Sequence, residues 1–253
     1  MTRPFRERIA SAASEKESRI VLAVDPPSGV ASPKEFAEKM ISGVQEYVCS
    51  IKINFHLVLP LSGPEIAQIN RLAHSFALQS IADIKLNDIE NTNSVALDHL
   101  LGNMGFDAVI VNPIIGQSSL TSLVKKAHNL HAGIIALVYM SQPGAREGYG
   151  LRISDGRNRR PQYEIFLERA ARAHADGIVV GATRPSILKQ AVKEQPGMPV
   201  YSPGIGAQGG DAVQALKCGS SYLIVGRAIV ESKDPAAKAR EMQIRISSLP
   251  VRN

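Results

Sequence analysis

Tryptophan is absent from this chain, and aromatic residues together make up only 5% of its 253 residues. Proteins that bind single-stranded nucleic acid stack the bases on aromatic side chains, and this chain offers few such platforms. Cysteine occurs only twice, at Cys49 and Cys218, each in or beside an apolar segment and without the spacing of metal ligands. The sequence therefore predicts a reduced protein with no metal site.

Long apolar runs are missing as well. No segment holds about 18 consecutive apolar residues, so a membrane-spanning helix is not expected. The first eight residues lack the apolar core of a secretory signal. With the scarcity of cysteine, these absences predict a cytoplasmic protein that does not bind membranes.

The formal net charge is +6, which reflects an excess of lysine and arginine that is scattered along most of the chain. An anionic small substrate explains this sign as well as a nucleic acid would, so a nucleic-acid partner is not expected. One basic cluster stands out within a long polar loop predicted between residues 141 and 161: Arg152, Arg157, Arg159 and Arg160. This loop is either a solvated surface segment or a basic lid over the substrate.

Eight short apolar runs alternate with segments of helical pattern. The runs cover residues 19–25, 47–53, 80–85, 107–111, 133–138, 177–180, 198–202 and 222–225. They are uniformly apolar rather than alternating, which is typical of a parallel sheet covered by helices. An amphipathic segment at residues 3–17 predicts a short helix before the first strand. The expected fold is α/β, a single (β/α)8 TIM barrel over residues 1–253, with a doubly wound sheet as the alternative.

Charged residues stand at the ends of the first three predicted strands. Asp25 ends the first strand, Lys52 lies near the end of the second, and Asp83 and Lys85 lie on the third, with Asp88 just beyond it. Alternation along a strand places Asp83 and Lys85 on one face. Each charge alone is more readily a surface residue, but the carboxyl ends of barrel strands carry active sites. Their joint placement therefore predicts a catalytic cluster.

Glycine-rich segments follow the last two predicted strands, at residues 202–211 and 225–228. Loops at these positions of a barrel commonly bind phosphate through backbone N–H groups. The side chains of Gln208 and Arg227 can donate further hydrogen bonds to an anion. The glycines also match a dinucleotide-binding pattern, but no acidic residue follows at the distance that a ribose contact requires. We therefore interpret the segments as a monophosphate site.

Together these segments resemble the orotidine 5'-monophosphate decarboxylase family over nearly the whole chain. The anchor is the run from Asp83 to Ile89, which reads D-x-K-x-x-D-I, with Thr92 three positions further on. The matching segments elsewhere are Asp25, Lys52, Met140–Ala145, Gly181–Pro185, Ser202–Gly209 and Gly226–Arg227.

The resemblance implies decarboxylation of orotidine 5'-monophosphate to uridine 5'-monophosphate, the last step of de novo pyrimidine synthesis, with no metal or cofactor. It implies that Lys85 protonates C6 of the pyrimidine and that Lys52, Asp83 and Asp88 complete a charge network. It assigns substrate binding to Asp25 and Lys52 at the ribose, Ser141 at the pyrimidine, Gln208, Gly226 and Arg227 at the phosphate, and to Pro203, Gly204, Ile205, Gly206 and Ala207 of the same loop. It also implies a homodimer in which Asp88, Ile89 and Thr92 enter the active site of the partner subunit.

Two alternatives remain at this point. D-x-K-x-x-D is shared with sugar-phosphate enzymes, so a related Mg²⁺-dependent lyase or aldolase using Asp83 is possible on the residues alone. The other alternative is a non-catalytic protein that binds phosphate or RNA through the basic residues 152–160.

Overall fold

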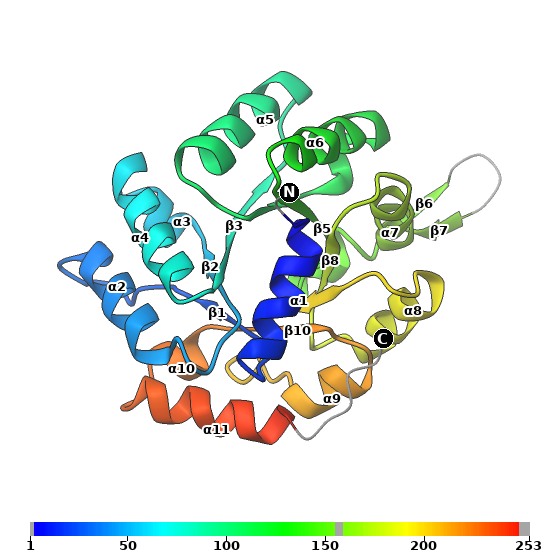
Figure 1. The fold of residues 1–253 in the computed structure, drawn as a ribbon. Helices are drawn as coiled ribbons and strands as arrows, with labels where there is room; N and C mark the ends of the chain where they lie inside the picture. The colour runs from blue at the N-terminus through cyan, green and yellow to red at the C-terminus, as the bar shows by residue number, and fades with distance from the viewer. Residues whose placement is uncertain (1–2, 155–158, 248–253) are drawn as a thin grey trace.

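The computed structural model describes residues 3–154 and 159–247, and within them eight parallel strands close into a barrel (Figure 1). The strands follow one another around the barrel in chain order, and the last pairs with the first. They are β1 (Ile20–Ala23), β2 (Ser50–Ile53), β3 (Gln79–Leu86), β4 (Ala108–Val111), β5 (Gly133–Tyr139), β8 (Gly177–Val180), β9 (Val200–Ser202) and β10 (Tyr222–Val225). The predicted (β/α)8 barrel is confirmed.

Helices surround the barrel and cover its outer face (Figure 1). The longer ones are α2 (Pro33–Val44), α4 (Gly63–Ser75), α5 (Glu90–Leu97), α6 (Gln117–Asn129), α7 (Gln162–Arg172), α8 (Pro185–Glu194), α9 (Ala212–Lys217) and α11 (Pro235–Ser247). Short turns of helix are α3 (Phe55–Val58), η1 (Asp98–Asn103), η2 (Pro113–Ile115), η3 (Pro143–Glu147) and α10 (Arg227–Val230). Among the helices of the described residues, none is both long and apolar enough to cross a membrane.

Local sequence explains where these helices begin. The Ser32 hydroxyl accepts a hydrogen bond from Glu35 N at 3.4 Å, and Pro33 occupies the first position of α2. Ser62 and Glu65 form a capping box at the start of α4.

Alternate strand residues face the barrel interior and the surrounding helices. In β1, Val21 and Ala23 belong to the interior cluster, whereas Ile20 and Leu22 pack with the helices outside. Both sets are fully or almost fully buried. This two-sided burial is the physical reason that the strands read as continuous apolar runs.

Helix α1 (Phe5–Glu15) lies across one end of the barrel (Figure 1). Its buried face, Phe5, Ile9 and Ala12, packs with the interior residues of the strands. Close approach needs a glycine at Gly133, because a Cβ there would lie 2.5 Å from the Phe5 ring. The helix thus closes the amino-terminal end of the barrel and leaves the carboxyl end for a site.

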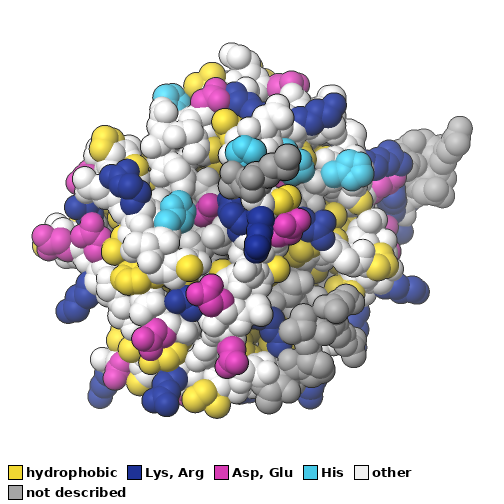
Figure 2. Space-filling view, viewed as in Figure 1, with side chains coloured by type: hydrophobic (Ala, Val, Ile, Leu, Met, Phe, Trp, Pro, Cys, Tyr) yellow, Lys and Arg dark blue, Asp and Glu magenta, His cyan; other side chains and the backbone are white. Residues whose placement is uncertain are grey.

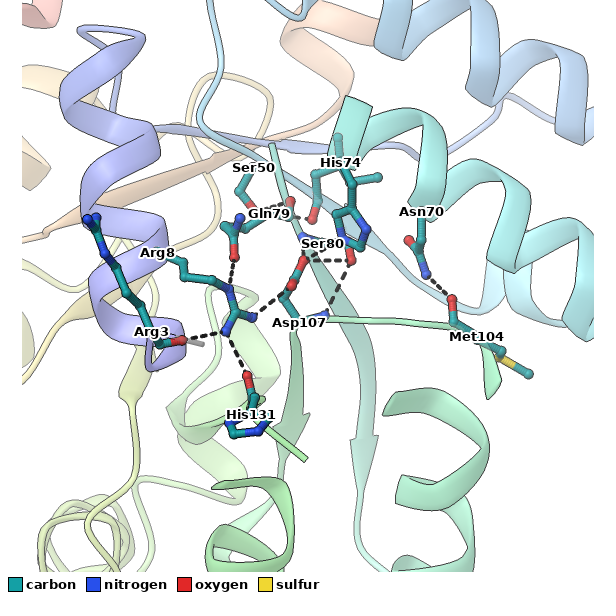
Figure 3. Close-up of polar contacts among 11 residues, drawn as sticks. Arg3, Arg8, Ser50, Asn70, His74, Gln79, Ser80, Met104, Asp107 and His131 are labelled. Carbon is teal, nitrogen blue, oxygen red and sulfur yellow. Dashed lines mark hydrogen bonds and ion pairs between the residues drawn. The ribbon is translucent and has the colours of Figure 1, made fainter. Parts of the chain in front are cut away.

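Arg8 ties this closing helix to the strands (Figure 3). It donates hydrogen bonds to Gln79 Oε1 at 2.9 Å, to Asp107 Oδ1 at 2.8 Å and to the His131 carbonyl at 2.7 Å. Burial raises the pKa of Asp107, but its hydrogen bond with His74 and the charges of His74 and Arg8 outweigh burial, and the pKa is lowered. Asp107 therefore serves as an ionised anchor beneath α1.

A second histidine–aspartate pair repeats this arrangement further round the barrel. His128 Nε2 lies 3.0 Å from Asp176 Oδ2, as His74 Nε2 lies 2.8 Å from Asp107 Oδ2. Each aspartate also accepts a backbone N–H from the start of the preceding strand, Ser80 or Ile134. Figure 2 shows histidine side chains around this end of the molecule, among charges of both signs.

The segment predicted as one long polar loop, residues 141–161, is more ordered than expected. It contains η3 and an antiparallel hairpin of β6 (Arg152–Ser154) and β7 (Arg159–Pro161), while Arg157 lies outside the described residues. The hairpin extends outward beside α7 (Figure 1), and Arg160 pairs with Glu168 of that helix at 2.6 Å. The structure therefore places the hairpin at the side of the barrel rather than over its open end.

Candidate active site

Four of the predicted charges meet at the open end of the barrel. Lys52 Nζ lies 2.8 Å from Asp83 Oδ2, and Lys85 Nζ lies 2.6 Å from Asp83 Oδ1. On the other side, Lys52 Nζ lies 4.0 Å from Asp25 Oδ1. The result is a row of alternating charge, Asp25–Lys52–Asp83–Lys85, across three neighbouring strands, which is named the charged row below.

The pairing of the strands sets this row. Ala23 of β1 pairs with Lys52 of β2, and Lys52 pairs with Ile81 of β3. Because Ala23 and Ile81 face the interior, the residues two positions further on, Asp25 and Asp83, emerge on the same side at the strand ends.

Lys85 reaches the row in a way that simple alternation does not predict. The register between β3 and β4 shifts between Ala82 and Leu86, so the pleat is interrupted there. Lys85 has a φ of +48°, in the left-handed region that non-glycine residues rarely adopt. The contact with Asp83 thus depends on an irregular backbone, a feature common at functional sites.

The charges of the row are shielded from water to different degrees. Only 5% of the Lys52 side chain and 12% of the Asp83 side chain are exposed, against 38% for Lys85. Burial raises the pKa of Asp83, but the ammonium groups of Lys52 and Lys85 outweigh it, and the pKa is lowered. Among the described residues, no group donates a hydrogen bond to the buried Asp25 Oδ1, so this atom can accept one from a ligand.

A cavity of about 230 Å³ opens beside the charged row. Its apolar surface comes from Ile110, Leu137, Val179 and Ile224, which face the barrel interior. Twelve predicted residues line it, namely Asp25, Lys52, Asp83, Lys85, Ser141, Pro203, Gly204, Ile205, Ala207, Gln208, Gly226 and Arg227. One wall is therefore charged in both signs, and the loops after β9 and β10 form another.

The loop after β9 is folded tightly against Ser141. Gly210 N donates to the Gly204 carbonyl at 3.0 Å, which closes a turn. Gly204 has a φ of +94°, and a Cβ there would lie 2.9 Å from Ser141 Cβ, so only glycine fits. Gly206 does not line the cavity. Its positive φ of +72° instead allows the chain to make the turn.

Three predicted residues lie outside the cavity of their own chain. Asp88, Ile89 and Thr92 follow β3 and are exposed to solvent, and 70% of Ile89 is exposed. Asp88 makes no ion pair within the described residues, and its carboxylate accepts a hydrogen bond from Ile89 N at 2.6 Å. The structure of a single chain therefore does not bring Asp88 to the charged row.

Asn54 and Gln142, to which the sequence analysis assigned no role, also line the cavity. Asn54 lies two positions after Lys52, so the same alternation that places Lys52 could have indicated it. Gln142 belongs to the segment Met140–Ala145 that matches the family, and its place directly after Ser141 was the available signal. Across residues 3–154 and 159–247, no group of three or more His, Cys, Asp or Glu is placed to hold a metal ion.

Comparison with known proteins gives one consistent result. The family model described as orotidine 5'-phosphate decarboxylase / HUMPS family matches residues 18–242. The orotidine 5'-phosphate decarboxylase of Pyrococcus horikoshii is 37% identical over 231 residues, which cover 89% of this chain and 99% of that protein. The enzyme of the same name from Methanococcoides burtonii is 33% identical over 231 residues, covering 90% and 97%.

A solved structure agrees with these sequences. The crystal structure of orotidine 5'-monophosphate decarboxylase from Methanocaldococcus jannaschii, complexed with the inhibitor BMP, superposes with a TM-score of 0.77 at 30% identity. The match covers 90% of this chain and 97% of that one. All of α1 precedes the segment that the family model matches.

Proposed function

The chain belongs to the orotidine 5'-phosphate decarboxylase / HUMPS family and is a decarboxylase of orotidine 5'-monophosphate, and we propose that it works without metal or cofactor, through its charged row. The product is uridine 5'-monophosphate. The observation that carries the proposal is the contact of Lys85 with Asp83 on one wall of the cavity that Gln208 and Arg227 also line.

The chemistry requires fixed charge near C6 of the pyrimidine. When the bond from C6 to the carboxylate breaks, CO2 leaves and the electron pair stays on C6 in an orbital that the ring cannot delocalise. The ammonium of Lys85 stabilises this charge and then gives its proton to C6, which completes the product. Asp83 binds Lys85 and Lys52 at once and so holds both ammonium groups in place.

Asp83 has a second role in the proposal. Its pKa is lowered, so it is ionised at neutral pH and repels the carboxylate of a substrate bound beside it. That repulsion disappears as CO2 leaves, which favours the transition state over the bound substrate.

The remaining parts of the nucleotide fit the other walls. Asp25 Oδ1 accepts a ribose hydroxyl and Lys52 donates to one, since both lie at the same end of the row. Ser141 contacts the pyrimidine. Gln208, Gly226 and Arg227, with the backbone of residues 203–207, bind the phosphate, and this remote contact orients the reacting end.

We further propose a cytoplasmic homodimer with shared active sites. Asp88, Ile89 and Thr92 do not line the cavity of their own chain, and the apolar Ile89 is largely exposed. Both facts are expected of residues that complete the site of a partner subunit.

The Mg²⁺-dependent sugar-phosphate alternative is not favoured. It needs carboxylate oxygens free to bind the ion, but each oxygen of Asp83 already accepts a lysine ammonium.

The test of the activity is the loss of near-ultraviolet absorbance when orotidine 5'-monophosphate is added, measured with and without a chelator. We expect turnover at the same rate in both. Lys85→Ala should abolish turnover, and Lys126→Ala, which removes a lysine paired with the exposed Asp98, should leave it unchanged. Chelator-sensitive turnover of a ketose phosphate, with none of the nucleotide, would instead favour the alternative.

The test of site sharing uses two inactive variants. Lys85→Ala and Asp88→Ala are mixed in equal amounts after dissociation and reassociation. Half of the dimers are then hybrids, and each hybrid regains one site with Lys85 from one subunit and Asp88 from the other. We expect roughly a quarter of wild-type activity from this mixture. A mixture as inactive as its components would show that the sites are not shared.

A further inference from the structure

We propose that Asn93 is the residue that positions Asp88 for the active site of the partner subunit. The inference rests on the proposed function, because it requires that Asp88 acts in the partner's site. The sequence analysis assigned no role to Asn93, which directly follows Thr92, the last residue named in the segment that begins at Asp83.

The first observation is the two-point contact between Asn93 and the backbone of Asp88. Asn93 Nδ2 donates to the Asp88 carbonyl at 2.5 Å, and Asn93 Oδ1 accepts from Asp88 N at 3.3 Å. The side chain therefore binds both backbone polar groups of one residue, which fixes the orientation of that peptide segment.

The second observation is the contrast in burial. Asn93 is 0% exposed, whereas residues 87–90 are all exposed. The segment that carries Asp88 therefore has little packing of its own, and a buried amide beneath it supplies the constraint. Burying an amide side chain costs free energy unless its donors and acceptors form hydrogen bonds. The Asp88 backbone bonds one donor and the acceptor of the Asn93 side chain.

The third observation concerns the start of α5. Its N-cap residue is Ile89, whose side chain cannot accept a hydrogen bond from the helix. Residues such as Ser or Asp would ordinarily fix this junction. Asn93, on the first turn of α5, instead binds the backbone of Asp88, the residue before the N-cap, and so fixes how the chain enters the helix.

These contacts matter for catalysis because the placement of charge is critical. Asp88 must meet a partner group across a subunit interface, and a displacement of about 1 Å can cost about a hundredfold in rate. The neutral amide of Asn93 fixes the backbone without binding the Asp88 carboxylate, whose Oδ1 accepts from Ile89 N and whose Oδ2 is left for the partner.

The first experiment compares Asn93→Ala with a matched control, Asn70→Ala. Asn70 is 1% exposed, and its Nδ2 donates to the Met104 carbonyl at 2.8 Å, near the amino-terminal end of the barrel (Figure 3). Both variants lose a buried amide-to-carbonyl hydrogen bond, so both should lower the Tm. At a temperature where both are fully folded, Asn93→Ala should lower kcat/KM about tenfold or more, and Asn70→Ala should change it less than about twofold.

The second experiment separates positioning from general damage. Asn93→Ala is mixed with Lys85→Ala as above. In a hybrid dimer, the subunit that carries Asn93→Ala keeps its own Lys85 and receives an intact Asp88 segment from the partner. We expect this site to turn over at the wild-type rate. A defect that stays with the Asn93→Ala subunit would overturn the proposal.

A second variant covers the case in which Asn93→Ala does not fold. Asn93→Ser is neutral and keeps one hydroxyl, so it can retain at most one of the two contacts with Asp88 without burying a charge, and we expect a smaller loss of kcat/KM that the same mixing restores. Wild-type kinetics for a folded Asn93→Ser and Asn93→Ala would overturn the inference while leaving shared sites intact. If mixing Lys85→Ala with Asp88→Ala restores nothing, the proposed sharing fails first, and the inference fails with it.

Discussion

Asp83 is bound on both sides by lysine ammonium groups and has little contact with water, so removing its charge should affect stability as well as catalysis. Asp83→Asn leaves the buried Lys52 with only Asp25 at 4.0 Å as a counter-charge. We expect turnover to fall and the free energy of unfolding at pH 7 to drop by about 3 kcal/mol, since an uncompensated buried charge is costly. Urea unfolding with parallel activity assays measures both.

The ionisation of Asp83 also makes the stability of the protein depend on pH. Its folded pKa is lowered from 3.8, so its stabilising effect is fully present above that value and is lost as the pH falls through the folded pKa. Asp83→Asn should lose less stability than the wild type over that acid range.

Asp98→Asn is the control for the stability of Asp83→Asn at pH 7. It breaks an ion pair whose carboxylate is 55% exposed, and it should lower the free energy of unfolding by less than about 1 kcal/mol. If Asp83→Asn and Asp98→Asn lowered the free energy of unfolding at pH 7 equally, the prediction that the buried charge of Asp83 is the more stabilising would be wrong.

At the scale of residues, alternation along a strand explains what could be predicted. It placed Asp25 and Lys52 on the interior face, because β1 and β2 are regular up to the strand ends. Alternation also predicted correctly that Lys85 lies on the same side as Asp83. It did not predict the irregular backbone at Lys85, because the register shift and the positive φ there depend on pairing with β4, which local sequence does not encode. The sequence did not indicate Asn93 for a similar reason. The role proposed for it depends on its contact with the Asp88 backbone and not on a pattern of residue types.

Helix α1 is held against the barrel by its apolar face and by the arginines Arg6 and Arg8, of which Arg8 contacts three other segments, so Arg8 should carry measurable stability. Arg8→Ala removes the hydrogen bonds to Gln79, Asp107 and His131. We expect a loss of about 3 kcal/mol in the free energy of unfolding, because Asp107 loses a charged partner while buried. Urea unfolding checks the value, and Arg71→Ala, an exposed arginine on α4, should stay within about 0.5 kcal/mol.

The pH profile of the Arg8→Ala variant gives a second measure. Without Arg8, the folded pKa of Asp107 should rise toward its usual value, so acid unfolding should begin at a higher pH than in the wild type. If acid unfolding of the variant begins at the same pH as in the wild type, the hydrogen bonds from His74 and Ser80 are enough to keep Asp107 ionised.

At the scale of elements, the strands and long helices were predictable because burial on one or two faces leaves a period in the sequence. The helix at residues 3–17 was predicted, but its position across the barrel end was not, because contacts such as Phe5 with Gly133 join distant parts of the chain. The hairpin of β6 and β7 escaped prediction because its exposed, arginine-rich strands bury no face and show no alternation.

The molecule as a whole separates its stabilising end from its proposed catalytic end. Arg8 of α1 and its partner Asp107 lie at the amino-terminal end, whereas the charged row and Arg227 lie at the carboxyl end. Between them the interior is filled by side chains such as Val21, Ile81 and Tyr201. Changes at the two ends share no partners and should therefore have additive effects.

This separation can be tested with the reaction product as a ligand. Uridine 5'-monophosphate at about one hundred times its Kd should raise the free energy of unfolding of the wild type by about 2.7 kcal/mol. Arg227→Ala should reduce that increment at the same ligand concentration, because the proposed function makes Arg227 a donor to the phosphate, and should leave the ligand-free stability nearly unchanged. Arg8→Ala should lower the ligand-free stability and keep the full increment. The double variant should show both effects, summing to within about 0.5 kcal/mol, because Arg8 and Arg227 lie at opposite ends of the barrel. An increment that shrinks in Arg8→Ala alone would mean that the closing helix is coupled to the nucleotide site through the barrel interior.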